Sequence, residues 1–126
     1  MAMQHANPRE LVDLRPLGPA IGRTKTAAIV KSSSFEAIRL IVRTGMRIAP
    51  HQVPGPITLH CLEGRVLLGL SDGELELSAG QWVYLEGGET HWLEGVEDAS
   101  LLLTILFAHR EDRSSGGPEA PGSNRN

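Results

Sequence analysis

The stretch that decides the fold is residues 65–85, RVLLGLSDGELELSAGQWVYL. It consists of three short apolar segments separated by two turn-like triplets, Ser71-Asp72-Gly73 and Ser78-Ala79-Gly80. Asp-Gly between two strand-like segments is a strong hairpin signal, because these residues tolerate the positive φ of tight turns. The stretch therefore predicts consecutive antiparallel β-strands.

The regions on both sides of this stretch show the same period of two. In FEAIRLIV, residues 35–42, the side chains of Ile38, Leu40 and Val42 share one face of the predicted strand. Further strand-sized segments are HWLE at 91–94 and SLLLTILFA at 100–108. Short strands separated by turn residues, without a convincing helix, predict an all-β sandwich or barrel.

Residues 43–64, RTGMRIAPHQVPGPITLHCLEG, interrupt the simple alternation. Pro50, Pro54 and Pro56 remove backbone donors and favour an extended, looping path. Such a segment is tolerated at the mouth of a barrel, where it can shape a pocket.

The chain of 126 residues has the size of one domain, and 40% hydrophobic with 21% charged residues suits a packed core. Prolines and glycines among scattered Leu and Val predict an extended N-terminal arm over residues 1–22. Residues 111–126 are rich in Gly, Pro and Ser and predict a disordered tail. The folded domain is expected over residues 23–110.

Charge and hydropathy exclude several classes of partner. A net charge of −3 without a dense Lys/Arg block predicts no nucleic-acid or membrane-surface binding. No apolar run approaches the roughly 20 residues that span a bilayer, and the first residues show no apolar signal segment. The single cysteine, Cys61, fits a reducing compartment, so a cytoplasmic location is expected.

Residues 80–95 carry a recognisable motif. Gly80 is followed by five residues, then by Glu86, Gly87 and Gly88, and after two more residues by His91. This spacing resembles the second motif of the cupins, in which a proline stands at the place of Glu86 and an asparagine at the place of Gly95. The glycines and the histidine match, whereas the proline and the asparagine do not.

The first cupin motif is matched less completely. Gly45, five residues and His51 fit its beginning, and Gly64 fits its end. Val53 stands at the place of the second histidine and Ile57 at the place of the glutamate. The resemblance covers roughly residues 35–110. It is closest to small single-domain bacterial cupins of the RmlC-like type, which carry a PGPIT-like stretch after the first histidine, and it implies a double-stranded β-helix, or jelly-roll barrel.

The resemblance also implies a metal site, because cupins typically hold Fe, Mn, Ni or Zn with three histidines and a carboxylate. His51 and His91 occupy two of these four places here. His60 is a further candidate ligand, although strand parity places it on the face opposite to Ile57 unless a bulge reverses the register. The same parity turns Cys61 inward, as a core thiol or, less simply, as a ligand for a soft metal.

Three functions stay open on these residues. The first is a metal-dependent cupin enzyme in which His51 and His91 hold a divalent transition metal that acts on a small organic molecule. The second is a metal-free cupin with a degenerate site that binds a small molecule, which Val53 and Ile57 favour because they make the site drier. The third is a scaffold whose role is dimerisation, and a homodimer is expected from the apolar strand at 100–108 and the N-terminal arm. Whether the protein is an enzyme is left undecided.

Overall fold

The structure is a computed structural model that describes residues 5–107. The expected tail at 111–126 lies outside the described residues. Within the described residues, a short 3-10 helix precedes seven strands. The elements are η1 (Gly18–Arg23), β1 (Ala27–Lys31), β2 (Phe35–Val42), β3 (Arg47–His51), β4 (Ile57–Leu70), β5 (Gly73–Ser78), β6 (Trp82–Leu85) and β7 (His91–Leu106).

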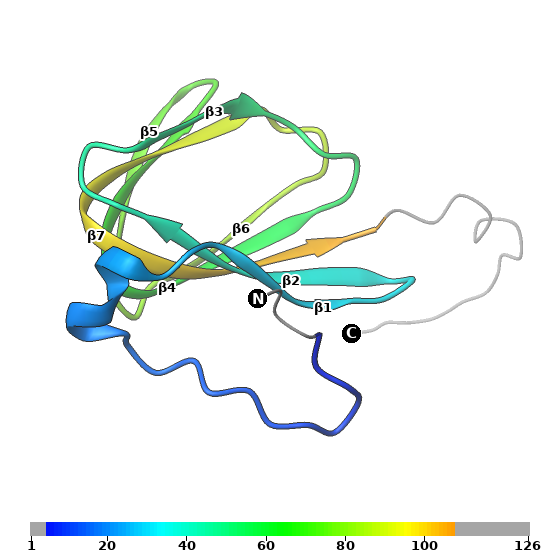
Figure 1. Cartoon of the computed structure of the whole chain (residues 1–126). Helices are drawn as coiled ribbons and strands as arrows, with labels where there is room; N and C mark the ends of the chain where they lie inside the picture. Colours follow the sequence, from blue (N-terminus) through cyan, green and yellow to red (C-terminus); the bar gives the residue numbers. More distant parts are fainter. Residues whose placement is uncertain (1–4, 108–126) are drawn as a thin grey trace, which may run out of the picture.

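The all-β prediction is confirmed: the strands form one continuous hydrogen-bonded sheet, which folds into two halves, sheet I and sheet II, that face each other across a core (Figure 1). Sheet I has the order β1-β2-β7-β4-β6, and sheet II has the order β3-β7-β4-β5. Every pairing is antiparallel. The long strands β4 and β7 belong to both sheets, because each bends from one sheet into the other.

The bend in β4 and β7 depends on a close backbone approach at Gly64. Gly64 has φ +79°, and a Cβ there would overlap the carbonyl oxygen of Asp98 on β7. The register between the two strands shifts in this region, between Cys61 and Val66. A residue without a side chain therefore lets the two strands stay paired through the corner.

Two strands are longer than the sequence predicts. The segments expected at 91–94 and 100–108 form one strand, β7, because Gly95 and Glu97 between them continue the pairing with β4 around the bend. The irregular path expected over 43–64 is interrupted by strand β3 at Arg47–His51 and ends at Ile57, where β4 begins. The predicted hairpin at Ser71-Asp72-Gly73 is confirmed, since Leu70 pairs with Gly73 across the β4–β5 turn.

The core between the sheets follows the alternation of the strands. Its members are Val42, Ile57, Leu59, Cys61, Val66, Leu68, Leu77, Leu85, Leu93, Ala99 and Leu101. Three further buried apolar side chains, Ile21 of η1, Ile29 of β1 and Ile41 of β2, do not belong to this cluster. Among residues 5–107, no helix is long and apolar enough to cross a membrane.

Candidate functional site

His51 and His91 meet at one end of the barrel. His51 closes β3 and His91 opens β7, and the antiparallel register pairs the two residues directly. Their ring centroids lie 4.5 Å apart with planes inclined at 56°. His91 is 5% exposed, whereas His51 is exposed at the rim. Residues 40 positions apart in sequence are therefore brought into one site by the β3–β7 pairing.

The loops beside the two histidines are packed against each other. Gly88 donates its backbone N–H to the carbonyl oxygen of Val53 at 2.7 Å. A Cβ at Gly87 would overlap the carbonyl oxygen of Pro54, so this contact requires glycine. The absence of a side chain at Gly87 thus leaves room for the backbone of Pro54, and the hydrogen bond from Gly88 holds the two loops together.

A cavity of about 170 Å³ lies behind the two rings, between the sheets. Its wall is aliphatic apart from the imidazoles. The lining residues are Leu40, Ile48, His51, Leu59, His91, Leu93 and Leu103. Every polar side-chain atom that reaches this cavity therefore belongs to His51 or His91.

The hydrogen bonds of both rings select the same tautomer. Nδ1 of His51 lies 3.2 Å from the carbonyl oxygen of Ala49, and Nδ1 of His91 lies 3.1 Å from that of Glu89. A carbonyl oxygen only accepts, so in a neutral ring Nδ1 carries the proton and donates it. The Nε2 lone pair of each neutral ring is then left free as an acceptor.

Burial holds His91 in its neutral form. Desolvation lowers the pKa of His91 most strongly, and the neighbouring His51 lowers it further, against the opposing effect of the carbonyl of Glu89. The imidazole of His91 is therefore uncharged at neutral pH.

His60 does not belong to this site. It pairs with Trp82 and Leu102 in an unbroken register, and it lies on the face of β4 opposite to Leu59, which lines the cavity. No bulge reverses the parity between Ile57 and His60. The prediction of His60 as a third ligand beside His51 and His91 is therefore wrong, because its side chain lies on the other face of β4.

The other places of the first motif carry no ligand either. Ile57 is buried in the core and Val53 packs against it. Cys61 faces inward as parity predicted, but its Sγ points to the carbonyl oxygens of Glu63 and Gly64 rather than to the cavity. Burial raises the pKa of its thiol, so Cys61 is a core residue rather than a thiolate ligand.

The cavity wall was only partly predictable. Leu40 lies on the inward face that the alternation in 35–42 indicated, and Leu59 shares the face assigned to Ile57. The sequence does not distinguish Ile48, Leu93 and Leu103 from other inward residues, because a sequence pattern separates inward from outward side chains without showing which inward ones leave a gap.

The separation of the two ring centroids is compatible with ligation of one transition-metal ion. With metal–nitrogen bonds of about 2.0–2.1 Å at a right angle, two ring centroids would lie about 4.5 Å apart, and the observed separation is 4.5 Å. Within residues 5–107, however, no group of three or more His, Cys, Asp or Glu side chains could share an ion. A metal here would take two protein ligands and leave its other positions to water or a bound molecule.

Solved structures with the same arrangement are found in several bacteria. A conserved protein of unknown function from Streptococcus pyogenes is 18% identical with a TM-score of 0.67, over 86% of this chain and 99% of that chain. A cupin superfamily protein from Desulfitobacterium hafniense is 16% identical with a TM-score of 0.67, over 82% and 100% of the two chains. An RmlC-like cupin from Shewanella frigidimarina is 17% identical with a TM-score of 0.61, over 69% and 78%.

No protein-family model matches the sequence, and no curated protein matches it. At identities below 25%, the likeness to the solved structures establishes the fold alone.

Proposed function

From the premise that this chain has the fold of a small single-domain cupin, we propose that its barrel binds a small organic molecule with one hydrogen-bond-donating end. The observation that carries the proposal is the aliphatic cavity whose polar groups are the two imidazoles at one end. Such a site is the usual form of a small-molecule pocket: mostly apolar, with few polar groups that fix orientation.

The cavity volume limits the size of the molecule. At about 170 Å³, it is close to the roughly 150 Å³ of an apolar cavity that accommodates a benzene ring. The ligand is therefore of the size of a phenol or a short alcohol, with its hydrocarbon part among Leu40, Leu59 and Leu103.

The tautomers of His51 and His91 determine which polar group the ligand needs. Neutral imidazoles that donate through Nδ1 to Ala49 and Glu89 offer Nε2 as an acceptor. A hydroxyl, phenol or ammonium group satisfies this acceptor, whereas an ether or ester does not. Leaving a buried acceptor unpaired costs about 1–3 kcal/mol, or roughly 5- to 150-fold in affinity.

Phenol and anisole test the proposal as a matched pair, because anisole has the same ring without the donor. In NMR titrations of chelator-treated protein we expect phenol to bind at least about fivefold more tightly than anisole. Leu103→Phe fills the cavity and should abolish phenol binding, whereas Leu102→Phe, on the outer face of the same strand, should preserve it. Equal affinity for phenol and anisole, or binding that survives Leu103→Phe, would contradict the proposal.

A divalent transition metal is the second candidate ligand, supported by the 4.5 Å ring separation and the two free Nε2 positions. His51 and His91 would hold the ion, which would supply Lewis acidity to a molecule bound beside it. In that case the aliphatic wall would position the molecule and exclude water, and neutral His91 would remain a ligand.

Elemental analysis and Zn²⁺ titration of untagged protein test the metal separately from phenol. Binding that is lost in both His51→Ala and His91→Ala but kept in His60→Ala would support a metal site. Failure of chelator-treated protein to take up Zn²⁺ would exclude Zn²⁺ as its ligand, and failure with Fe²⁺, Mn²⁺ and Ni²⁺ as well would exclude the metal. Phenol binding would stand unaffected in either case.

A further inference from the structure

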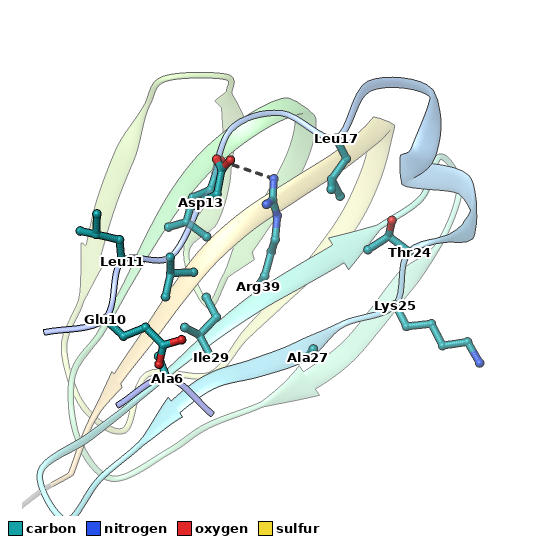
Figure 2. Close-up of a pocket in the computed structure, with 12 residues that line it drawn as sticks. Ala6, Glu10, Leu11, Asp13, Leu17, Thr24, Lys25, Ala27, Ile29 and Arg39 are labelled. Atoms are coloured by element: carbon teal, nitrogen blue, oxygen red, sulfur yellow. Dashed lines mark hydrogen bonds between the residues drawn. The ribbon is translucent and has the colours of Figure 1, made fainter. Parts of the chain in front are cut away.

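A hollow of about 340 Å³ lies between the N-terminal arm and the outer face of sheet I, the face turned away from the barrel interior (Figure 2). The arm is attached to the sheet on both sides of the hollow. At one end, Ala6 donates its backbone N–H to the carbonyl oxygen of Ile29 on β1. At the other end, the Glu63 carboxylate accepts the N–H groups of Leu17 and Gly18. The arm therefore forms the roof of the hollow, and β1 and β2 form its floor.

The hollow and the barrel cavity lie on opposite faces of the same sheet. On β2, Arg39 lines the hollow, whereas the next residue, Leu40, lines the cavity behind His51 and His91. Because successive side chains of a strand point to opposite faces, the backbone of sheet I separates the two spaces. A molecule bound under the arm therefore makes no contact with the two imidazoles.

Most of the lining of the hollow is apolar. It includes Leu11, Val12, Leu14 and Leu17 on the arm, and Ala27 and Ile29 on β1. The volume of about 340 Å³ falls within the roughly 300–1,000 Å³ that is usual for small-molecule pockets. An apolar cavity of roughly 150 Å³ accommodates a benzene ring, so by proportion the hollow suits a molecule of about ten to thirteen non-hydrogen atoms.

The polar wall of the hollow carries a guanidinium with unused donors. Within residues 5–107, every hydrogen bond of Arg39 starts from Nη2. Its acceptors are the carbonyl oxygens of Leu14 and Arg15 and Oγ of Ser100, and the carboxylate of Glu63 also faces Nη2, at 3.5 Å. A guanidinium has donors on all three nitrogens. The donors of Nη1 are therefore available for a second acidic group.

The charges of the lining favour an anion in the hollow. Two acids, Glu10 and Asp13, are part of the lining, but a backbone N–H already binds Glu10 and the side chain of Arg15 binds Asp13. The two cations of the lining are Lys25, which is exposed at the rim, and Arg39 with its unused donors. A carboxylate satisfies such donors better than a neutral oxygen does, because hydrogen bonds between charged groups are the stronger ones.

We propose that the hollow under the arm binds a medium-chain carboxylic acid such as octanoate, with its carboxylate at Nη1 of Arg39 and its hydrocarbon chain between the arm and β1. With about ten non-hydrogen atoms, octanoate suits the volume of the hollow. Its chain removes the apolar lining from water, which is the main source of binding free energy for such a molecule. This site is separate from the proposed phenol site.

Octanoate and methyl octanoate test the charge of the ligand as a matched pair, because the ester has the same chain without the carboxylate. In NMR titrations of the full chain at neutral pH, we expect octanoate to bind at least about tenfold more tightly. Intermolecular NOEs from its chain should reach the methyl groups of Leu17, Ala27 and Ile29. Equal affinity for acid and ester, no binding of octanoate at millimolar concentration, or NOEs confined to the leucines of the barrel cavity would overturn the proposal.

Two substitutions at the attachment of the arm separate the carboxylate contact from the position of the arm. Arg39→Gln and Glu63→Gln each remove a group that holds the arm, but only Arg39→Gln removes the proposed partner of the ligand. The preference for octanoate over its methyl ester should disappear in Arg39→Gln and persist in Glu63→Gln. A preference that survives in Arg39→Gln would contradict the assignment of Arg39.

A pair of filling variants separates the hollow from the barrel cavity. Ala27→Phe fills the hollow from its floor and should abolish octanoate binding while phenol binding persists. Leu103→Phe should abolish phenol binding while octanoate binding persists. Octanoate binding that survives Ala27→Phe, or that is lost in Leu103→Phe, would place the acid elsewhere. The NOEs of the wild type decide the question even if Ala27→Phe does not fold.

Discussion

Arg39 and Glu63 lie 3.5 Å apart, Nη2 to Oε2, beneath the N-terminal arm, and both side chains bind the backbone of that arm. The Glu63 carboxylate accepts the N–H groups of Leu17 and Gly18, and Nη2 of Arg39 donates to the carbonyl oxygen of Arg15 at 2.8 Å. Ser100 on β7 donates to the same carboxylate at 2.6 Å. Arg39 lies on β2 and Glu63 on β4, the two strands that flank β7 in sheet I. Together they fix the arm to this sheet.

Glu63→Gln should loosen the arm. The amide keeps one acceptor oxygen but loses the charge that faces Arg39, and a partly buried guanidinium is left unneutralised. We expect a loss of about 1–3 kcal/mol in the free energy of unfolding and faster amide exchange at Leu17 and Gly18. Glu76→Gln, which removes an exposed ion pair with Arg65, is the control and should change stability by less than about 1 kcal/mol. Equal effects of the two substitutions would show that Glu63 does not hold the arm.

Glu63 also predicts an acid-sensitive stability. Burial opposes its ionisation, but hydrogen bonds from Leu17, Ser100 and Gly18, together with the charge of Arg39, outweigh burial and lower the pKa of Glu63. Its contribution is therefore fully present above the unfolded pKa of about 4.3 and is lost as the pH falls through the lower folded value. Urea unfolding between pH 3 and pH 7 should show this acid loss, and Glu63→Gln should reduce its slope.

Gly87→Ala should separate the two loops at the mouth of the barrel. The added Cβ would overlap the Pro54 carbonyl oxygen, and backbone on both sides must move. We expect a loss of about 1–3 kcal/mol in stability together with weaker phenol binding. Gly22→Ala is the matched control, because a Cβ there meets no atom within 4 Å. If both variants unfold at the same denaturant concentration, the Gly87–Pro54 contact does not matter.

His91 predicts a second dependence on pH. Its folded pKa is lowered, chiefly by burial, so the unfolded chain binds a proton more readily than the folded chain. Stability should therefore fall as the pH drops below the unfolded value of about 6.5. His91→Gln should flatten this slope between pH 5 and pH 7, whereas His60→Gln, on the outer face of β4, should keep it. An unchanged slope in His91→Gln would contradict the burial of a neutral imidazole.

The positions of the strands and of His91 could be predicted from the sequence, because both depend on local patterns. Alternation identified the inward face of 35–42, and Asp72-Gly73 identified the β4–β5 hairpin. The spacing of Gly80, Gly87 and Gly88 predicted His91 as a site residue, and in the structure its ring lies beside that of His51. Strand parity also argued against His60, and the unbroken β4–β6 register bears this argument out.

Contacts between distant segments could not be predicted in the same way. The cavity depends on which inward side chains fail to fill the space between two sheets, and this is a property of packing rather than of any one strand. The position of Glu63 beneath the arm also depends on distant segments, because its partners Leu17 and Arg39 lie 46 and 24 residues away along the chain. Likewise, the two segments expected as separate β-strands at 91–94 and 100–108 form one strand, β7. Its bend depends on the close approach of Gly64 on β4 to the backbone of Asp98.

Intermolecular NOEs from the ring protons of phenol to assigned leucine methyl groups, recorded with chelator present, test the central claim most directly. The inward residues Leu40, Leu59 and Leu103 line the cavity, whereas Leu102 and Leu106 lie on the outer face of the same sheet. Binding in the barrel predicts NOEs to the methyl groups of the three inward leucines. NOEs confined to Leu102 and Leu106, or no NOEs at saturating phenol, would contradict it.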